Sequence, residues 1–307
     1  MMILGAKINL QKEGGTMPKI LNYGSLNLDY VYNVEHFVQP GETMASKSLS
    51  VGCGGKGLNQ SIACAKAGGR VFHAGKIGAE GGRLKEELER SGVDTSYLCR
   101  DNGSNGHAII QVNEEGNNCI LLYAGSNYRI EEEEIDASLE GFTKGDYLIL
   151  QNEVNHIPYM INKAYEKGMY IVLNPSPVTG NLQEYPLDKV SLFILNEVEG
   201  KALSGEQSEK EILRVLKEKY PKAELLLTLG EKGSIYTYGD QMIYQKAYPV
   251  KTVDTTAAGD TFTGYFVACR AADKSIEESL DAASKAAAFA CMRKGAAISI
   301  PEWKEIL

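Results

Sequence analysis

From about Lys19 onward, short apolar runs alternate with segments of helical periodicity. The apolar runs, which end in polar or Gly residues, span 19–24, 70–75, 146–151, 169–174, 191–196 and 224–230. The helical patterns between them span 58–68, 82–92, 158–168 and 209–220, and each ends at Gly or Pro or just before one. Continuous apolar strands that alternate with helices are typical of a parallel sheet covered on both faces. The pattern predicts an α/β fold whose ligands bind beyond the carboxyl ends of the strands.

Two segments interrupt this alternation. Residues 25–51 and 107–125 lack helical periodicity and alternate as strands do, and the second predicts a hairpin that turns at residues 115–117. Together they predict a small antiparallel sheet that stands off the main sheet. The acidic run 131–134 predicts the N-terminus of a helix, where acidic side chains are favoured.

Length and composition bound the possible functions. The 307 residues suit one large domain, which we expect to span residues 17–307, with residues 1–16 as an N-terminal tail. The net charge of -8 argues against nucleic acid or an anionic membrane surface as a partner. No apolar run approaches the roughly 20 residues of a membrane span. Six cysteines without a CxxC pair argue against a zinc site and predict free thiols in a reducing cytoplasm.

The stretch DTTAAGDTF, residues 254–262, directly precedes an apolar segment of helical character. Small residues at a helix start leave backbone N–H groups open, and these groups form an anion site. Asp260 would lie at the same helix start, where it has two interpretations. It could be an N-cap, or it could take a proton from a hydroxyl that attacks a bound phosphate.

A glycine-rich turn into a helix, GCGGKGLNQ, occupies residues 52–60. It satisfies GxGxxG formally, but the preceding segment is polar and no acidic partner follows about 20 residues later, so a dinucleotide site is disfavoured. A Walker A loop fails too, because Gly57 follows Lys56 where Ser or Thr is required. The turn places Lys56 and Asn59 near the helix start, within reach of polar hydroxyls.

The segments GGKGLNQSIACAKAGG (54–69) and DTTAAGDTFTGYF (254–266) resemble the two signature motifs of the PfkB, or ribokinase-like, carbohydrate kinases. The similarity extends from about Lys19 to Pro301. Segments that resemble the ribokinase branch of this family follow in order at 24–29, 150–153, 195–200, 228–234 and 292–301. The resemblance implies a ribokinase-like fold with a β lid formed from about 27–55 and 106–125.

The resemblance also implies the roles of the acceptor-site residues. Asp260 matches the general base that deprotonates the primary hydroxyl of the sugar, and the N–H groups of Ala257, Ala258 and Gly259 match the anion hole. The residues that match those binding ribose hydroxyls are Asn27, Asp29, Gly55, Lys56, Asn59 and Glu153. Ordinary turn chemistry after a strand is the alternative for the first two of these.

For the nucleotide and the cations, the resemblance implies three further groups. Asn196 and Glu199 match a motif linked to Mg²⁺ and its waters, although Asn196 could also be simply a helix N-cap. Thr228, Gly230 and Gly233, together with Asn196 and Gly259, match positions that lie against ATP. The positions that match a monovalent-cation (K⁺) site are Asp254, Thr256, Ala290, Arg293, Gly295 and Ser299. For Asp254, a capped turn is the alternative.

The expected reaction is transfer of phosphate from ATP to D-ribose, which gives ribose 5-phosphate, in a homodimer that pairs through its lids. A PfkB kinase of another sugar or nucleoside, or a non-catalytic sugar sensor, remains an alternative. Two places depart from the pattern: residues 152–154, and His107 in the lid, where a small apolar residue is more common. A lone His is more often structural than functional.

Overall fold

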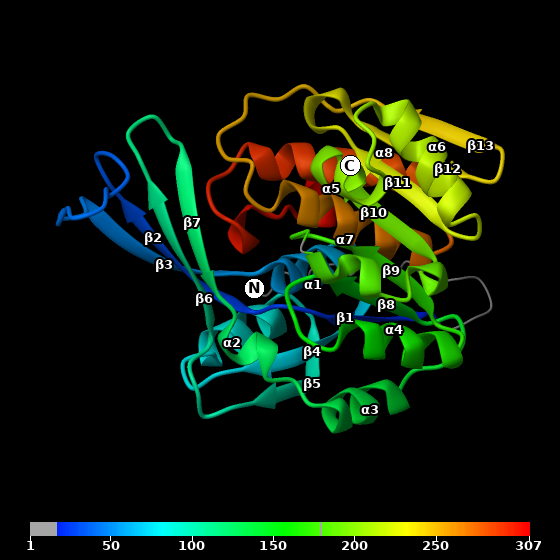
Figure 1. Cartoon of the computed structure of the whole chain (residues 1–307), viewed down its shortest axis with the longest axis horizontal. Helices are drawn as coiled ribbons and strands as arrows, with labels where there is room; N and C mark the ends of the chain where they lie inside the picture. The colour runs from blue at the N-terminus through cyan, green and yellow to red at the C-terminus, as the bar shows by residue number, and fades with distance from the viewer. Residues whose placement is uncertain (1–16, 179) are drawn as a thin grey trace, which may run out of the picture.

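The computed structural model describes residues 17–178 and 180–307, and its centre is a nine-stranded sheet (Figure 1). The sheet contains β1 (Lys19–Tyr23), β4 (Arg70–Ile77), β5 (Asp94–Arg100), β8 (Tyr147–Gln151), β9 (Tyr170–Asn174), β10 (Leu192–Asn196), β11 (Glu224–Thr228), β12 (Ser234–Tyr238) and β13 (Gln241–Gln245). Their order is β13-β12-β11-β10-β9-β8-β1-β4-β5, and only the pairings of β12 with β11 and β13 are antiparallel. The carboxyl ends of the parallel strands therefore meet at one edge of the sheet.

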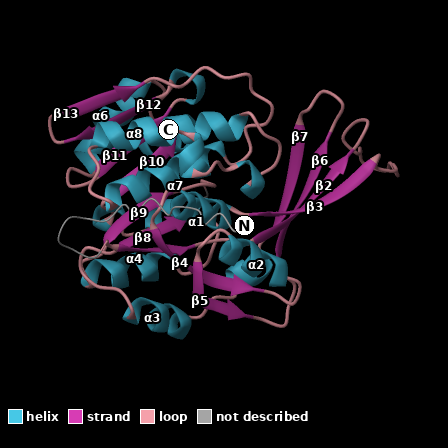
Figure 2. Cartoon of the chain, turned by 180° about the vertical axis from the view of Figure 1, so that it is seen from behind, coloured by secondary structure: helices cyan, strands magenta, loops and turns pink. Residues whose placement is uncertain are grey.

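Helices cover both faces of the main sheet, and each face has its own hydrophobic core (Figure 2). One core includes side chains of α1 (Lys56–Lys66), α2 (Gly82–Arg90), α7 (Ala258–Ala271) and α8 (Ile276–Cys291). The other includes side chains of α3 (Glu132–Glu140), α4 (Ile157–Glu166), α5 (Glu197–Ser204) and α6 (Glu209–Lys219). Burial on both faces explains why the parallel strands are continuous apolar runs.

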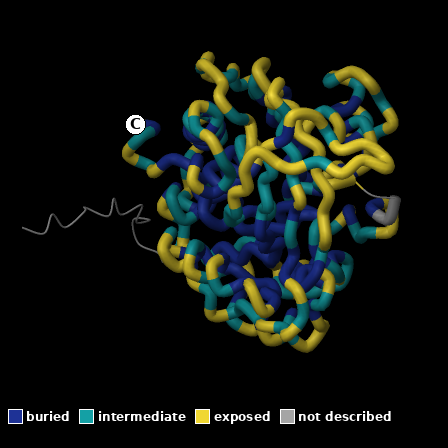
Figure 3. Tube along the Cα trace, turned by 90° about the vertical axis from the view of Figure 1, so that its left-hand side faces the viewer, coloured by how far each residue is buried: buried dark blue, intermediate teal, exposed yellow. Residues whose placement is uncertain are grey.

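A second sheet projects from the main body (Figure 1), and we call it the small sheet. It contains β2 (Asn27–Asn33), β3 (Ser48–Gly54), β6 (Gly106–Val112) and β7 (Asn118–Tyr123), in the order β3-β2-β6-β7. The two outer pairings are antiparallel, as expected, whereas the central pairing of β2 with β6 is parallel. Every residue of β7 is exposed, and Figure 3 shows the largely exposed trace of the small sheet in front of a buried interior.

Two close backbone contacts fix helix α1 in this fold. A Cβ at Gly264 of α7 would lie 2.4 Å from the Cβ of Ala63, so the absence of a side chain lets α7 pack directly on α1. A Cβ at Gly57 would lie 2.4 Å from the carbonyl carbon of Gly24, so the start of α1 rests on the segment that follows β1. These contacts bring α1, α7 and the carboxyl end of β1 together.

The predicted strands and helices coincide with the observed ones to within two residues at most ends. The hairpin at 115–117 connects β6 to β7, and Glu131 caps α3 through a capping box, as the acidic run predicted. Helix α8 and strands β5, β12 and β13 were not predicted. The proposed tail, residues 1–16, lies outside the described residues. Within residues 17–178 and 180–307, no helix is long and apolar enough to cross a membrane.

Candidate active site

Asp260 is the third residue of α7 and is only 7% exposed. It is not the N-cap, because that position belongs to Ala257, whose φ of 61° lies in the left-handed region. Its Oδ2 accepts a hydrogen bond from Asn59 Nδ2 at 3.0 Å, and its Oδ1 accepts one from Gln60 Nε2 at 2.9 Å. The remaining acceptor of Asn59, Oδ1, has no partner among residues 17–178 and 180–307. The carboxylate is therefore held by two amides, one of which retains a buried free acceptor.

The turn into α7 leaves open space in front of the helix. Gly259 is exposed, and apart from its chain neighbours and the backbone of its own helix, a Cβ built there would meet no atom of the described chain within 4 Å. The first N–H groups of an α-helix lack intrahelical partners and carry the positive end of the helix dipole. Residues 257–259 thus offer a favourable field for an anion immediately beside the Asp260 carboxylate, although the Ala258 N–H already donates to the Thr255 carbonyl at 3.2 Å.

Strand β2 brings Asn27 and Asp29 to the same edge of the fold. Asn27 is buried and its Oδ1 accepts a hydrogen bond from Asn127 Nδ2 at 2.8 Å. Burial, together with the charge of Glu153, raises the pKa of Asp29 to about 7. A Cβ at Gly54 would lie 2.0 Å from Asp29 Oδ2, so this carboxylate lies directly over the glycine-rich turn.

Gly55 precedes α1 with a φ of 96°, and a Cβ there would lie 2.8 Å from the carbonyl oxygen of Ser25. Only glycine accommodates both the left-handed backbone and this close approach. The turn delivers Lys56 to the side of Glu153, because the Lys56 N–H donates to Glu153 Oε2 at 3.2 Å. The Ser25 hydroxyl donates to the same oxygen.

Lys56 lies among three carboxylates. Burial lowers the pKa of its ammonium group, but Asp260, Glu153 and Glu199 outweigh burial and hold that pKa above its usual value. Burial also raises the pKa of Glu153, more than the charge of Lys56 and the Ser25 hydroxyl lower it. Lys56 is therefore cationic at neutral pH, and its charge interacts with the carboxylates of Asp260, Glu153 and Glu199.

Asn196 and Glu199 form the start of α5. Asn196 is its N-cap, since its side chain accepts from the Glu199 N–H at 2.9 Å, and Glu199 Oε2 accepts from the Asn196 N–H at 2.9 Å. The N-cap interpretation is thus confirmed. Both oxygens of the buried Glu199 already accept amide donors, the second from Asn196 Nδ2 at 2.9 Å. This arrangement fits contact with a hydrated cation through water better than direct ligation.

The predicted nucleotide positions follow β11 at the same edge. The Thr228 hydroxyl donates to the Leu195 carbonyl at 3.2 Å, which ties β11 to β10. Gly230 begins a short 3₁₀ turn and is exposed. Gly233, with a φ of 114°, closes this turn where a Cβ would lie 2.0 Å from the Gln245 carbonyl oxygen.

Asp254 connects two loops. Its Oδ1 accepts from the Thr256 N–H at 2.9 Å and from the Thr256 hydroxyl at 2.6 Å, and its Oδ2 accepts from the Gly295 N–H at 2.9 Å. Burial raises the pKa of Asp254, but these hydrogen bonds outweigh it and hold that pKa below its usual value. The capped turn therefore exists, and it brings 254–256 against 293–299.

The oxygen atoms predicted for a monovalent cation are partly engaged within the protein. The Ala290 carbonyl accepts from the Arg293 N–H at 3.1 Å, and the Ser299 hydroxyl donates to the Ala296 carbonyl at 2.7 Å. Carbonyl, hydroxyl and carboxylate oxygens still suit a hard cation. No group of three or more His, Cys, Asp or Glu side chains that could hold a metal occurs in the described part of the chain.

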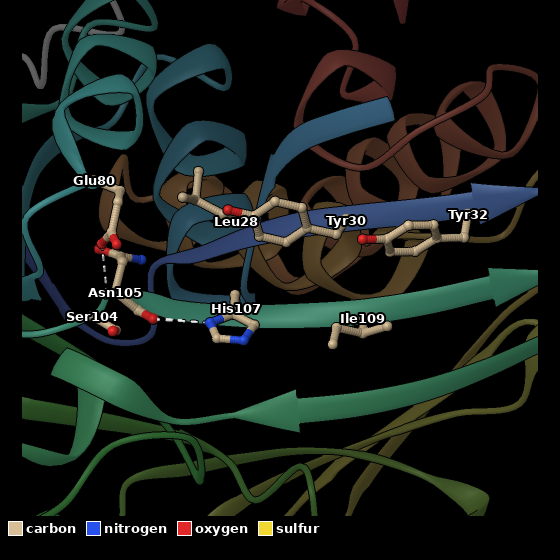
Figure 4. A pocket seen from close by; sticks show the side chains of 8 residues that line it. All are labelled: Leu28, Tyr30, Tyr32, Glu80, Ser104, Asn105, His107 and Ile109. Carbon is tan, nitrogen blue, oxygen red and sulfur yellow. Dashed lines mark hydrogen bonds between the residues drawn. The ribbon is translucent and has the colours of Figure 1, made fainter. Parts of the chain in front are cut away.

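His107, which Figure 4 shows along one pocket with Tyr30 and Tyr32, lies on the face of the small sheet opposite Asp29. It pairs with Leu28, whereas Asp29 pairs with Ala108, and successive strand residues face opposite ways. The ring of His107 packs against Tyr30 and Tyr123, with centroids 5.9 and 5.0 Å away. It lines a pocket of about 250 Å³ with Leu28, Tyr30, Tyr32, Glu80, Ser104, Asn105 and Ile109. The structure thus gives His107 a packing role, on the face opposite Asp29.

Sequence reasoning missed four side chains, three of which hydrogen-bond predicted site residues directly. Gln60 bonds Asp260, Gln151 bonds Gln60, Ser25 bonds Glu153, and Asn127 bonds Asn27. Gln60 directly follows Asn59 in the glycine-rich motif, and Gln151 ends an apolar run. Both residues therefore lie in segments that the sequence analysis had already singled out. The signal that could have identified them is a large polar side chain at a position predicted to be buried.

The model of the pfkB family of carbohydrate kinases matches residues 17–303. This chain belongs to that family. A pfkB relative, the ribokinase of Haemophilus influenzae, is 33% identical over 294 residues, which cover 92% of this chain and 95% of the relative. The deoxyribokinase of Salmonella typhi is 31% identical, with 91% and 94% covered. The structure of Arabidopsis thaliana ribokinase complexed with ribose and ATP has a TM-score of 0.85 at 27% identity, and the match covers 95% of this chain and 98% of that one.

These comparisons confirm the predicted family and the ribokinase-like fold. They also make the chain a carbohydrate kinase, in agreement with the sequence around the glycine-rich turn, which disfavoured a dinucleotide site. The roles of the individual site residues remain predictions.

Proposed function

We propose that this kinase transfers the γ-phosphate of ATP to the primary hydroxyl of a small sugar, with D-ribose as the acceptor. The observation that carries the proposal is the placement of the Asp260 carboxylate, held by Asn59 and Gln60, beside the open helix start at 257–259. A carboxylate beside an anion cradle suits a reaction in which a hydroxyl loses a proton as it attacks a phosphate. A ribokinase complexed with ribose and ATP shares this fold.

In the proposed mechanism, the primary hydroxyl of the sugar lies against Asp260, which accepts its proton as the oxygen attacks the γ-phosphorus in line. The N–H groups of residues 257–259 stabilise the charge on the transferred phosphoryl group. Lys56, which stays cationic, offsets the negative charges that gather there. The secondary hydroxyls bind Asn27, Asp29, Asn59 and Glu153, and the small sheet acts as a lid that excludes water.

The proposed cofactors are ATP, Mg²⁺ and K⁺. Mg²⁺ would be held through waters beside Asn196 and Glu199, where it would neutralise phosphate charge. K⁺ would lie between the two loops that Asp254 joins, where it would order the turn at 254–256. ATP would lie against Thr228, Gly230 and Gly233 at the carboxyl edge of β11.

We further propose a cytoplasmic homodimer that pairs through the small sheet. All six cysteines carry free thiols, as in a reducing compartment. The small sheet exposes large apolar side chains, of which Leu121 is 67% exposed, and such a patch favours a protein partner. Replacing Leu121 with Asp should shift the protein from dimer to monomer in light scattering. An unchanged mass would argue against pairing through β7.

The test of the activity is release of ADP by purified protein with ATP, Mg²⁺ and K⁺, with and without D-ribose. Turnover that depends on ribose supports the proposal. The deoxyribokinase likeness makes 2-deoxyribose the second candidate, and equal or faster turnover with it would replace ribose as the acceptor. Background ADP release with ribose, 2-deoxyribose and a panel of hexoses and nucleosides would favour a non-catalytic sugar sensor.

A further inference from the structure

A chain of buried amides leads from the interior of the main domain to Asp260. Gln60 Nε2 donates to Asp260 Oδ1 at 2.9 Å, and Gln60 Oε1 accepts from Gln151 Nε2 at 2.8 Å. The other proton of Gln151 Nε2 is donated to Asn22 Oδ1 at 2.9 Å. Gln60, Gln151 and Asn22 are fully buried. Burying three amides is unfavourable unless they are hydrogen-bonded, so each link constrains the next.

The direction of this chain is fixed. If the Gln60 amide were reversed, its oxygen would face the Asp260 carboxylate and its NH₂ group would face the NH₂ group of Gln151. If Gln151 were reversed, its oxygen would face the oxygens of both Asn22 and Gln60. Only the observed orientation gives a donor to Asp260 Oδ1, to Gln60 Oε1 and to Asn22 Oδ1. The remaining acceptor of the path, Gln151 Oε1, has no donor among residues 17–178 and 180–307. The orientation of Gln151 thus ensures that Gln60 presents N–H, rather than oxygen, to Asp260.

The far end of the chain is anchored and uncharged. Asn22 Nδ2 donates to the Gly57 carbonyl at 2.8 Å and to Ser61 Oγ at 2.9 Å, and Ser61 Oγ lies 2.8 Å from His73 Nδ1. Burial lowers the pKa of His73 to about 4, so the ring is neutral at physiological pH. The hydrogen-bonded amides therefore keep their orientation near neutral pH, because His73 at the inner end of the series does not change its charge there. The series links β1, β4, β8 and α1 to the first turn of α7.

We propose that Gln60 is a positioning residue for Asp260, and that Gln151 orients Gln60 for this task. The inference rests on the proposed function, because it gives Asp260 the role of base. The amides of Asn59 and Gln60 each occupy one carboxylate oxygen, which fixes the rotation of the group and leaves its other lone pairs for the sugar hydroxyl. Unlike Asn59, which retains a free acceptor, Gln60 has both ends of its amide committed within the protein. Gln60 therefore acts on the carboxylate rather than on the sugar.

The test is Gln60→Met, which keeps the length of the side chain and removes the donor. We expect kcat to fall about 10- to 100-fold, as for the loss of a hydrogen bond to a charged group, while KM for the sugar changes less than about threefold. The acid limb of the pH–kcat profile should move to higher pH by about one unit, because the ionised carboxylate has lost a donor. Gln151→Met should give a smaller change in the same direction.

A matched control separates positioning from stability. Thr237 is buried in β12, and its hydroxyl donates to the Gln241 carbonyl at 2.8 Å, far along the sheet from α1. Thr237→Val also removes one buried hydrogen bond, so it should lower Tm without moving kcat or the pH profile. If Gln60→Met changes only Tm, as Thr237→Val is expected to do, Gln60 is merely structural and the proposal is overturned.

A double-mutant cycle shows whether Gln60 acts through Asp260. In an Asp260→Asn background, Gln60→Met should have almost no further effect on kcat, because the group it positions is gone. A full further loss of kcat would overturn the proposal. Wild-type turnover in Asp260→Asn alone would overturn the base role itself. Full turnover in Gln60→Met beside an impaired Asp260→Asn would overturn only the role of Gln60.

One readout does not need turnover. The ¹³C chemical-shift titration of the Asp260 carboxyl, assigned by its loss in Asp260→Asn, should have a midpoint at higher pH in Gln60→Met than in the wild type. An unchanged midpoint would overturn the positioning role, even if no acceptor sugar were found and the proposed function had failed.

Discussion

The acceptor half and the nucleotide half of the candidate site are built differently. On the acceptor side, Asn27, Asn59 and Asp260 are 6%, 5% and 7% exposed, and their side chains are already hydrogen-bonded. On the nucleotide side, Gly230 and Gly259 are exposed, and backbone dominates over side chains. A sugar offers hydroxyls in several directions and needs directed partners, whereas a phosphate needs N–H groups and a favourable field. In the proposed function, the acceptor would therefore be selected by side chains that are already in place before the substrates arrive.

The largest effect should come from the residue where the two halves meet. Asp260→Asn should lower kcat about 10²- to 10⁴-fold, because the base is lost. Tm should also fall somewhat, because the new amide has only one oxygen to accept the two hydrogen bonds that Asn59 and Gln60 donate to Asp260. Steady-state kinetics and thermal unfolding measure the two effects separately.

The other aspartate of the same motif provides the control. Asp254 bonds its own loop and Gly295, so Asp254→Asn should mainly weaken activation by K⁺ and leave much of kcat at saturating K⁺. Equal losses of kcat in both variants would argue that Asp260 has no special role.

Substitutions of two glycines, one in each half of the site, test whether the acceptor half is packed more tightly than the nucleotide half. Gly57→Ala would force a Cβ to 2.4 Å from the Gly24 backbone, so we expect a loss of about 1–3 kcal/mol in the free energy of unfolding. Gly259→Ala points into open space within a helix, where alanine is favoured, so stability should be unchanged or higher by up to about 1 kcal/mol. Urea unfolding of both variants checks this, and similar losses would contradict the contrast between the halves.

The pH dependence of stability tests burial on the acceptor side. Because the pKa of Asp29 is raised to about 7, the folded protein retains a proton between pH about 4 and 7 that the unfolded chain has lost. The stability that Asp29 contributes therefore falls as pH rises through this window. Relative to wild type, Asp29→Asn should gain on the order of 1–3 kcal/mol between pH 5 and pH 8 in urea unfolding.

Sugar binding should lower the pKa of Asp29 again. Hydroxyl donors favour the ionised carboxylate, so binding near pH 6.5 should release a proton, and calorimetry in two buffers of different ionisation enthalpy measures it. No proton release in the wild type, or equal release in Asp29→Asn, would show that the sugar does not contact Asp29.

The smallest expected effect concerns the cap of α5. Asn196→Ala should cost about 1 kcal/mol in the free energy of unfolding, because the Glu199 N–H loses its acceptor. Ser208 caps α6 in the same way, through the Glu211 N–H at 3.3 Å. Ser208→Ala should cost a similar amount with unchanged kinetics, whereas Asn196→Ala should also raise the Mg²⁺ concentration needed for half-maximal rate. Identical kinetics in the two variants would show that Asn196 only caps α5 and has no role in Mg²⁺ binding.

The sequence predicted elements well where one local signal was enough. The apolar runs gave β1 and β8 to β11 nearly to the residue, and Gly116 marked the turn between β6 and β7. The motif also predicted that Asp260 would stand at a helix start. It did not reveal that Ala257 is the N-cap, because that depends on a left-handed φ at a residue that rarely adopts one.

The partners of the site residues could not be predicted, because they depend on how distant elements pack. Gln60 and Asp260 are 200 positions apart, and they meet because α1 and α7 touch at Gly264. The parallel pairing of β2 with β6 likewise joins segments some 79 positions apart in sequence, so no hairpin signal announces it. A motif names the residue types, whereas the fold decides that the neighbouring amides of Asn59 and Gln60 both face the carboxylate.

The contact at Gly264 has a consequence for engineering. The proposed base and its two amide donors lie on two helices packed backbone to backbone, whereas Asn27 and Asp29 lie on a strand of the small sheet. Part of the surface that would select the sugar thus lies on another element than the group that would do the chemistry, while Asn59 belongs to both. A library confined to β2 and β6 could be screened for new acceptor sugars while the reacting centre stays as it is.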